Sequence, residues 1–389
     1  MRVVHVGKRV AAVVTFGIAL LTPIAPAHAE TAGTLIAEYP LPDDSRGMSD
    51  ADGSVIEYCM RGSGGMTQPA SGALYVPAGS PPPSGWPIIA YDHGTSGLGP
   101  GCGGQSDPLE HPAQTIAAIA GDEDSLLQYL ASQGFAVVAP DYLGLGVFDT
   151  GPHPYLGIDT EATATIDLVR AARAAHPELS RTWAVMGASQ GGQAALGTGH
   201  LQATDAPDLD FRGTIAIDPE SDVEKLAPLF GPGTPTPSVI ADGFMDLLVG
   251  ILAGLRAARP EVNVDEYLTL EGRSVLDSVG AMCTPQIIDR VRGLSIDDVL
   301  AKPLSAAADA YMTVPTTGYN APILLCIDIT DTIVPSPLHG LLAAQLAVHG
   351  VDFHTVLGTG KHTQLNPQMW TAIEQFVARI RSDPAIGNP

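Results

Sequence analysis

A serine flanked by glycines is the residue with the clearest chemical potential in this chain. Ser189 is the centre of the run Gly-Ala-Ser-Gln-Gly (187–191), which follows an apolar stretch (183–186) and precedes an alanine-rich stretch reaching His200. A Gly-x-Ser-x-Gly turn between a strand and a helix holds its serine in a strained backbone conformation with the hydroxyl exposed. The following helix directs its N-terminal dipole at that hydroxyl. The pattern therefore predicts a nucleophile rather than an ordinary glycine-rich turn.

A serine hydroxyl becomes an effective nucleophile only when a base takes its proton and an acid orients that base. In a strand–serine–helix arrangement of this kind, the acid and then the histidine follow the serine along the chain. Two carboxylates, Asp328 and Asp331, follow the apolar stretch 323–327. Asp331 is favoured because it lies further along the loop, whereas Asp328 at the strand end is suited to capping the turn.

Four histidines follow these carboxylates. His362 lies in the glycine-containing segment 358–363, between the last expected strand and the terminal helix, and such a loop is what a base needs to reach the serine. His339, His349 and His354 are interpreted as cap or surface residues. His362 is therefore the predicted base.

An oxyanion formed at the serine requires two backbone N–H donors. One is expected from Gln190, which directly follows the nucleophile. The other is expected from Gly94 or Thr95, in the loop after the short apolar strand 87–91, because glycine allows the backbone to approach a substrate closely.

Strands and helices alternate over the first part of the chain. This order predicts a mostly parallel sheet with helices on both faces, and in such sheets ligands bind where the loops after the strands gather. Residues 30–54 are expected to be irregular. The expected strands are 55–60, 73–76, 87–91, 136–139, 183–186, 213–218, 322–327 and 352–357, and the expected core helices are 122–133, 161–175, 190–200, 341–348 and 367–381.

The alternation stops at residue 219 and returns at about 321. Between them the pattern predicts helices over 238–259, 264–282, 285–291 and 295–300, an insertion expected to cap the active-site edge. The predicted organisation is therefore a core of residues 30–218 and 321–389, with a helical cap or lid over 219–320. The very apolar stretch 244–252 is interpreted as a core helix of the cap or, alternatively, as a wall for an acyl chain.

The N-terminus has the pattern of a secretory signal. Basic residues precede an apolar run (10–21), and Ala-His-Ala (27–29) fits a small-x-small cleavage site, so residues 1–29 are predicted to be removed on export. An uncleaved N-terminal anchor is the alternative. The net charge of −23 argues against nucleic acid as a partner.

Four cysteines occur in this exported chain, at positions 59, 102, 283 and 326, and four cysteines allow three pairings. Export favours disulfides. No cysteine or histidine cluster has the spacing of a metal site, so neither a metal nor another cofactor is predicted.

Taken together, the segments 91–95, 140–146 and 187–192, Asp331 and His362 make the chain resemble the secretory lipase family, the lipase A-type α/β-hydrolases. The segment 140–146, Pro-Asp-Tyr-Leu-Gly-Leu-Gly, is the more discriminating one. The resemblance implies an α/β-hydrolase fold, a large helical insertion before the acid, and a Cys102–Cys283 disulfide. One departure is Asp328, where the family usually has glycine.

The resemblance also implies ester hydrolysis, with triacylglycerols or shorter acyl esters as substrates. A secreted, monomeric lipase that contacts lipid transiently through its cap is the expected function. A short-chain carboxylesterase or an acyltransferase would use the same triad, and a non-catalytic lipid-binding homologue is a more remote alternative.

Overall fold

The computed structural model describes residues 31–382, apart from 43–45, 47, 49, 108–116, 230, 235–240 and 304–308. The predicted signal peptide (1–29) lies outside the described residues. Within the described part of the chain, no helix combines the length and the apolar character that crossing a bilayer requires.

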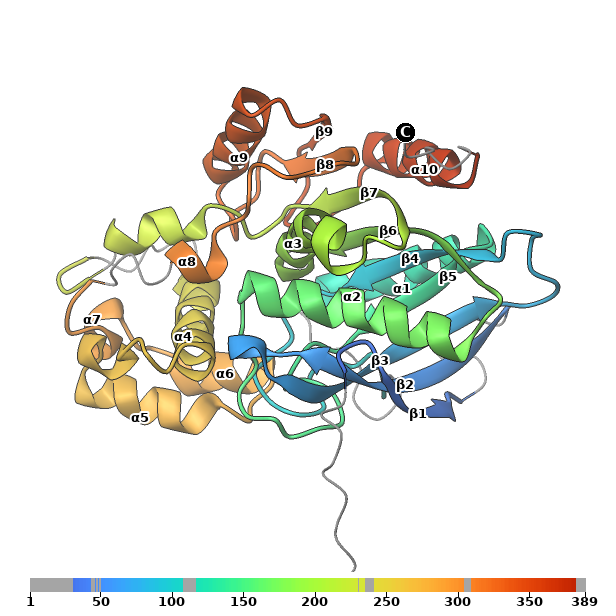
Figure 1. The fold of residues 1–389 in the computed structure, drawn as a ribbon. Coiled ribbons are helices and arrows are strands. Elements are labelled where there is room, and N and C mark those ends of the chain that lie inside the picture. Colours follow the sequence, from blue (N-terminus) through green and yellow to red (C-terminus); the bar gives the residue numbers. More distant parts are fainter. Residues whose placement is uncertain are drawn as a thin grey trace, which may run out of the picture. The chain divides into compact units, whose positions relative to one another are not determined.

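A nine-stranded sheet forms the centre of the described chain, in the order β1-β2-β3-β5-β4-β6-β7-β8-β9 (Figure 1). The neighbouring strands β5, β4, β6, β7, β8 and β9 run parallel to one another. The pairs β1–β2, β2–β3 and β3–β5 are antiparallel. The sheet is therefore mostly parallel, as predicted. The strands are β1 Leu35–Pro40, β2 Ala51–Arg61, β3 Thr67–Pro77, β4 Trp86–Asp92, β5 Ala136–Pro140, β6 Leu179–Ala188, β7 Asp210–Ile217, β8 Ile323–Asp328 and β9 Phe353–Gly358.

The prediction that residues 30–54 are irregular was wrong. Leu35–Pro40 forms β1, and β2 already begins at Ala51. β1 is an edge strand that pairs only with β2, and its register shifts between Leu35 and Ala37. None of its residues is buried, so this strand lacks the apolar pattern by which a core strand is recognised.

Helices cover both faces of the sheet, as predicted. On one face, α2 (Ile158–Ala175) and α3 (Gln190–Asp205) share a core with Trp183 and Val185. On the other face, α1 (Ala117–Ser132) and α10 (Pro367–Ser382) share a core with the alternate residues of the same strand, Ala184 and Met186. This alternation along β6 fixes the strand between two apolar layers. Helix α9 (Ser336–Val348) packs against β8 and β9.

The chain between β7 and β8 is helical and lies beside the sheet in Figure 1. Its apolar core also includes Leu98, Tyr155 and Leu156 from the loops after β4 and β5. The predicted single helix over 264–282 is divided, because Leu268 forms an isolated β-bridge with Leu300 and Thr269 caps the next helix. The elements are η3 Val223–Leu229, α4 Ala241–Ala258, η4 Val264–Tyr267, α5 Leu270–Val279, α6 Thr284–Val291, α7 Ile296–Val299 and α8 Asp309–Met312; the short turn η2 Ser63–Gly65 precedes β3.

The apolar residues of α4 pack in the core of this helical segment. Met245, Leu248, Val249, Ile251 and Leu252 are all buried in its core. Their burial favours the interpretation of this stretch as a core helix over that of an open acyl wall.

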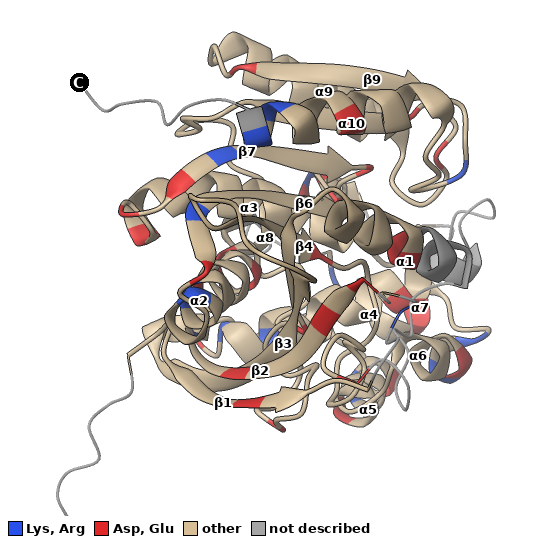
Figure 2. Ribbon diagram, turned by 90° about the vertical axis from the view of Figure 1, so that its right-hand side faces the viewer, with Lys and Arg blue, Asp and Glu red and all other residues tan. Residues whose placement is uncertain are grey.

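The red segments of the ribbon in Figure 2, which mark Asp and Glu, are more prominent than the blue ones, which mark Lys and Arg, in keeping with the net charge of −23. Several carboxyl groups are buried rather than exposed, among them Asp92, Glu161, Asp218 and Glu220. A buried carboxyl group requires hydrogen-bond partners. Those partners are found at the edge of the sheet where the loops after the parallel strands meet.

Candidate active site

Ser189 lies on a sharp turn between β6 and α3. Its φ of 57° and ψ of −122° place a non-glycine residue in a strained region of backbone space. A Cβ atom on Gly187 would lie 2.1 Å from the carbonyl oxygen of Gly191, and one on Gly191 would lie 1.9 Å from that of Asp92. Both glycines are therefore required by close packing, and the turn holds the serine where the sequence predicts a nucleophile.

Ser189, His362 and Asp331 form an unbroken line of hydrogen bonds. The Oγ atom of Ser189 lies 2.8 Å from Nε2 of His362, and Nδ1 of the same imidazole lies 2.6 Å from Oδ2 of Asp331. The carboxylate oxygen accepts, so Nδ1 carries the hydrogen and Nε2 of the neutral ring is free to accept the serine proton. Three side chains from loops that are distant in sequence are thus brought together.

The two competing carboxylates after β8 have different partners. Asp331 also accepts backbone N–H groups from Ile333 (2.7 Å) and Val334 (3.2 Å) on its other oxygen, which fixes the carboxylate toward the imidazole. Asp328 instead accepts the N–H of Gly360 at 2.6 Å. The side chain of Asp328 therefore ties the loop of His362 to the end of β8, and Asp331 is the residue that contacts the imidazole.

The other histidines do not contact Ser189 through any hydrogen bond in the described chain. His349 and His354 are exposed, in agreement with their interpretation as cap and surface residues. For His339 that interpretation was wrong, because the residue is buried and its Nε2 donates to the carbonyl oxygen of Pro219 at 3.1 Å. Burial lowers the pKa of His339 to about 4.

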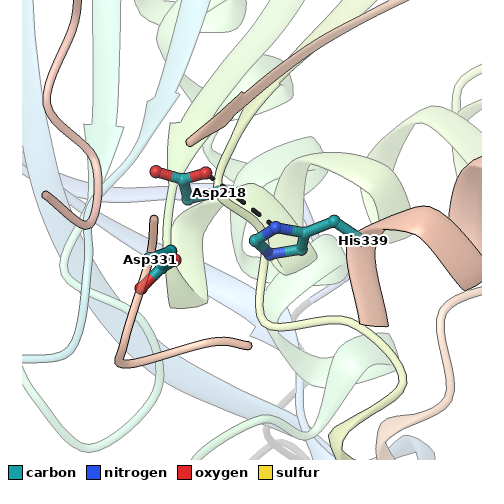
Figure 3. Close-up of side chains that lie close together, drawn as sticks. All are labelled: Asp218, Asp331 and His339. Carbon is teal, nitrogen blue, oxygen red and sulfur yellow. Dashed lines mark ion pairs between the residues drawn. The ribbon is translucent and has the colours of Figure 1, made fainter. Parts of the chain in front are cut away.

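Asp218 links the loops that carry His362 and Asp331. Its two oxygens accept the backbone N–H groups of Asp328 and Thr363, each at 2.7 Å. Nδ1 of His339 faces one of these oxygens at 4.0 Å, as the dashed line in Figure 3 marks. Burial raises the pKa of Asp218 to about 7. Asp218, which directly follows β7, is therefore hydrogen-bonded both to the end of β8 and to the loop after β9.

Asp218, Asp331 and His339 are also the one group in the described residues whose ligand atoms lie within 4.8 Å of one another, the spacing of a metal site (Figure 3). Each oxygen of the two carboxylates already accepts an N–H group. The carboxylate oxygens are thus used in hydrogen bonds that hold loops, although Nδ1 of His339 has no hydrogen-bond partner among the described residues, and we assign no metal to the group.

Of the predicted oxyanion residues, Gln190 directly follows Ser189 in the first turn of α3, and Gly94 approaches the serine from the loop after β4. The side-chain amide of Gln190 contacts Oε1 of Glu161 at 2.7 Å and Nε2 of His153 at 2.8 Å, so this buried side chain is anchored at both amide hydrogens. A Cβ atom on Gly94 would lie 3.7 Å from Cβ of Ser189, so the backbone of Gly94 runs against the serine. The loop of Gly94 and the first turn of α3 therefore flank the hydroxyl from two sides.

A carboxyl group also contacts Ser189 directly, and the sequence analysis missed it. Oε1 of Glu220 lies 3.1 Å from the serine Oγ, and the residue is 3% exposed. Tyr155 and Thr95 contact the same carboxyl group through their hydroxyls. One signal was present: Glu220 follows a parallel strand, β7, whose carboxyl end lies at the same edge of the sheet as Ser189.

The Cys102–Cys283 disulfide is present, with a Cα–Cα distance of 5.3 Å. It joins the loop after β4 to the start of α6. Next to it, the N–H of Leu98 donates to the carbonyl oxygen of Met282 at 2.9 Å. Cys59 and Cys326 are buried thiols on β2 and β8.

Solved structures with the same fold include lipases and esterases. Lipase A of Candida antarctica in its closed state is 17% identical, with a TM-score of 0.71 over 92% of this chain and 85% of that chain. The ligand-bound rice cell wall degrading esterase LipA from Xanthomonas oryzae is 22% identical, with a TM-score of 0.68 over 90% of this chain and 98% of that chain. The chain thus has the α/β-hydrolase fold. A search of curated proteins finds no match.

The family model described as secretory lipase matches residues 109–388, which is well over half of the chain. This range contains Ser189, Asp331 and His362, together with the helical segment between β7 and β8. The protein therefore belongs to the secretory lipase family and is a hydrolase of the lipase and esterase type.

Proposed function

We propose that the protein is a secreted lipase that cleaves triacylglycerols or related acyl esters through a Ser-Asp-His triad. The observation that carries the proposal is the line of hydrogen bonds from Ser189 through the imidazole of His362 to Asp331. Its order along the chain, serine then acid then histidine, is that of the α/β-hydrolases. Membership in the secretory lipase family supports the choice of substrate class.

In the proposed reaction, the Oγ atom of Ser189 attacks the ester carbonyl carbon while Nε2 of His362 takes the hydroxyl proton. The C–O bond to the alcohol then breaks, and the imidazolium returns that proton to the leaving oxygen. Water attacks the acyl-enzyme with the same imidazole as base, and the carboxylic acid leaves. Asp331 holds the tautomer in which Nε2 is free to accept a proton.

Two features of the site support the charge changes in this reaction. Burial opposes the imidazolium, but the hydrogen bond to Asp331 and the charge of that carboxylate act in the opposite direction, and the pKa of His362 is raised. The oxyanion is proposed to bind the backbone N–H of Gln190 and that of Gly94 or Thr95. The strained turn and the close approach of Gly94 support this assignment.

The segment 219–320 is proposed to act as a cap, whose helices share an apolar core with the loops after β4 and β5. Transient contact with lipid through this cap, a monomeric state, and export through a cleavable signal over residues 1–29 complete the proposal. The family and the Cys102–Cys283 disulfide support an extracytoplasmic location.

The proposal is tested by measuring hydrolysis of p-nitrophenyl esters from C2 to C16 together with an emulsified triacylglycerol. A lipase is expected to hydrolyse the emulsion and the longer esters. Activity confined to C2–C4 esters would make the protein a short-chain carboxylesterase with the same triad. Addition of an alcohol acceptor, with product analysis, separates hydrolysis from acyl transfer.

Labelling with a fluorophosphonate tests the nucleophile directly. The purified mature protein is expected to be modified at Ser189, as mass spectrometry of the peptide would show. A protein that is neither labelled nor active on any of these esters would instead be a non-catalytic homologue.

A further inference from the structure

The hydroxyl of Ser189 has two polar neighbours, and the reaction proposed above uses only one of them. Nε2 of His362 lies 2.8 Å from the serine Oγ, and Oε1 of Glu220 lies 3.1 Å from it. A hydroxyl has a single proton to donate and lone pairs that accept. Ser189 can therefore donate to one of these neighbours only, and the other neighbour must donate to Ser189 or lose its hydrogen bond.

Two proton arrangements satisfy both contacts. In the first, Ser189 donates to the neutral imidazole, and a protonated Glu220 donates its own proton to the serine Oγ. In the second, Ser189 donates to an ionised Glu220, and the imidazolium donates from Nε2 to the serine Oγ. Both arrangements contain the same number of protons. Only the first leaves His362 able to take the serine proton.

The surroundings of Glu220 suit a carboxylic acid as well as a carboxylate. Its oxygens lie 2.9 and 3.0 Å from the hydroxyl of Tyr155, and Oε1 lies 3.1 Å from the hydroxyl of Thr95. Hydroxyls donate or accept, in contrast to backbone N–H groups, which only donate. Both hydroxyls can therefore adjust to either protonation state of Glu220.

The charged groups that face Glu220 do not stabilise a carboxylate permanently. His362 is positive only when protonated, and Asp246 on α4 adds a second buried carboxyl group that interacts with Glu220. Burial raises the pKa of Glu220 above its ordinary value, although hydrogen bonds from Tyr155, Thr95 and Ser189 and the charge of His362 act against this. A neutral Glu220 is thus accessible in the folded protein.

Glu220 is also fixed relative to the nucleophile. Its backbone N–H donates to the carbonyl oxygen of Ser189 at 3.1 Å, and the N–H of Ser189 donates to Ile217 at the end of β7 at 2.9 Å. The serine turn and the loop after β7 are therefore joined by their backbones. This link places the backbone of Glu220 beside the nucleophile, and the hydroxyls of Tyr155 and Thr95 hold its carboxyl group.

We propose that Glu220 is a positioning residue that works in its protonated form, donating to the Oγ atom of Ser189 so that the serine hydroxyl points to His362. Loss of this proton turns the hydroxyl toward Glu220 and leaves a negative charge beside the forming oxyanion. The inference rests on the proposed function, because it concerns the proton that the triad must transfer.

The test is the pH profile of kcat/KM for Glu220→Gln, measured from pH 4 to 10 with tributyrin in a pH-stat. A glutamine amide can donate to the serine but cannot ionise. Because kcat/KM reports the ionisations of the free enzyme, the wild type is expected to lose activity at least about tenfold on the alkaline side. The variant is expected to keep its plateau activity to within about tenfold and to lack the alkaline decrease.

Two further variants make the test specific. Glu224→Gln removes another buried carboxylate, which accepts from Thr313 rather than from Ser189, and its profile is expected to match the wild type. Tyr155→Phe removes a hydrogen bond that lowers the pKa of Glu220, so its alkaline limb is expected to move to higher pH. An infrared band of a protonated carboxyl group that is lost only in Glu220→Gln would report the acid directly.

The inference is overturned if the wild type and Glu220→Gln decrease equally at alkaline pH, if neither decreases, or if the folded glutamine variant loses more than about a hundredfold at every pH. Failure of the proposed function looks different. In that case the wild type hydrolyses no ester at any pH, and a fluorophosphonate does not label Ser189.

Discussion

Two carboxyl groups are linked to the Ser189 hydroxyl, Asp331 through the imidazole of His362 and Glu220 by direct contact, and their surroundings differ. Asp331 is surrounded by N–H donors, two from the backbone and one from the imidazole of His362. Glu220 is surrounded by hydroxyls, from Tyr155, Thr95 and Ser189 itself. N–H groups can only donate, so they match a carboxylate, whereas hydroxyls also match an acid. The same functional group is thereby suited to opposite tasks within one site.

The largest effect is expected from Ser189→Ala, which removes the Oγ atom that both His362 and Glu220 contact. Activity on p-nitrophenyl butyrate should fall by about 10⁴-fold or more, because neither the imidazole nor the oxyanion donors can replace the nucleophile. The melting temperature, followed by circular dichroism, should stay near that of the wild type and serves as the control for folding. Appreciable activity in a folded alanine variant would show that another residue attacks the ester.

The next largest effect is expected at Asp331, the carboxylate that accepts N–H groups. Asp331→Asn should lower kcat/KM by about 10³- to 10⁴-fold, since an amide in place of the carboxylate no longer holds the catalytic tautomer of His362. Asp328→Asn is the matched control after the same strand, and it should cost less than about tenfold because Asp328 contacts Gly360 rather than the imidazole. If Asp328→Asn proved the more damaging change, the assignment of the acid would have to be exchanged.

The difference between the two carboxyl groups also explains what could be predicted from the sequence. Ser189, Asp331 and His362 are recognisable because each occupies a loop directly after an expected strand, in a fixed order along the chain. Asp331 could be preferred over Asp328 because it lies further into its loop, and its contact with His362 agrees with that preference. Local order and spacing were sufficient to select these three residues as candidates.

The contact between Glu220 and Ser189 could not be predicted in the same way. Glu220 is one of three acids in five residues after β7, and nothing local separates it from Asp218 or Asp222. Its position at the serine depends on how the loops of Thr95 and Tyr155 pack around it. The edge strand β1 was missed for a comparable reason, since its formation depends on pairing with β2 rather than on an apolar pattern of its own.

A moderate effect is expected from removing the disulfide that connects the loop of Gly94 and Thr95 to the helical segment. The double variant Cys102→Ser, Cys283→Ser should be less stable by about 2–5 kcal/mol, because a cross-link over 181 residues restricts the unfolded chain. Scanning calorimetry should record a melting temperature lower by several degrees. The wild type treated with dithiothreitol should behave like the variant, and equal melting temperatures would mean that the bond contributes little to stability.

The smallest effect is expected from Asp246, the buried acid beyond Glu220 on α4. Burial raises the pKa of Asp246 to about 7, with a smaller contribution from Glu220. The folded chain then holds this proton more tightly than the unfolded chain, so its contribution to stability is complete below the ordinary pKa near 4 and is lost as the pH rises through about 7. Asp246→Asn removes this dependence. Its melting temperature relative to the wild type should therefore be higher at pH 8 than at pH 5, by about 1–3 °C.

The exposed carboxylate of Asp352 offers the control for this last comparison, since at pH 8 Asp352→Asn changes the net charge by the same amount as Asp246→Asn without changing a buried group. Its effect on the melting temperature should be the same at both pH values. The burial of Asp246 would then be the cause of the pH dependence, because the exposed Asp352 does not share it. Equal shifts in the two variants would instead attribute the effect to the overall negative charge of the protein.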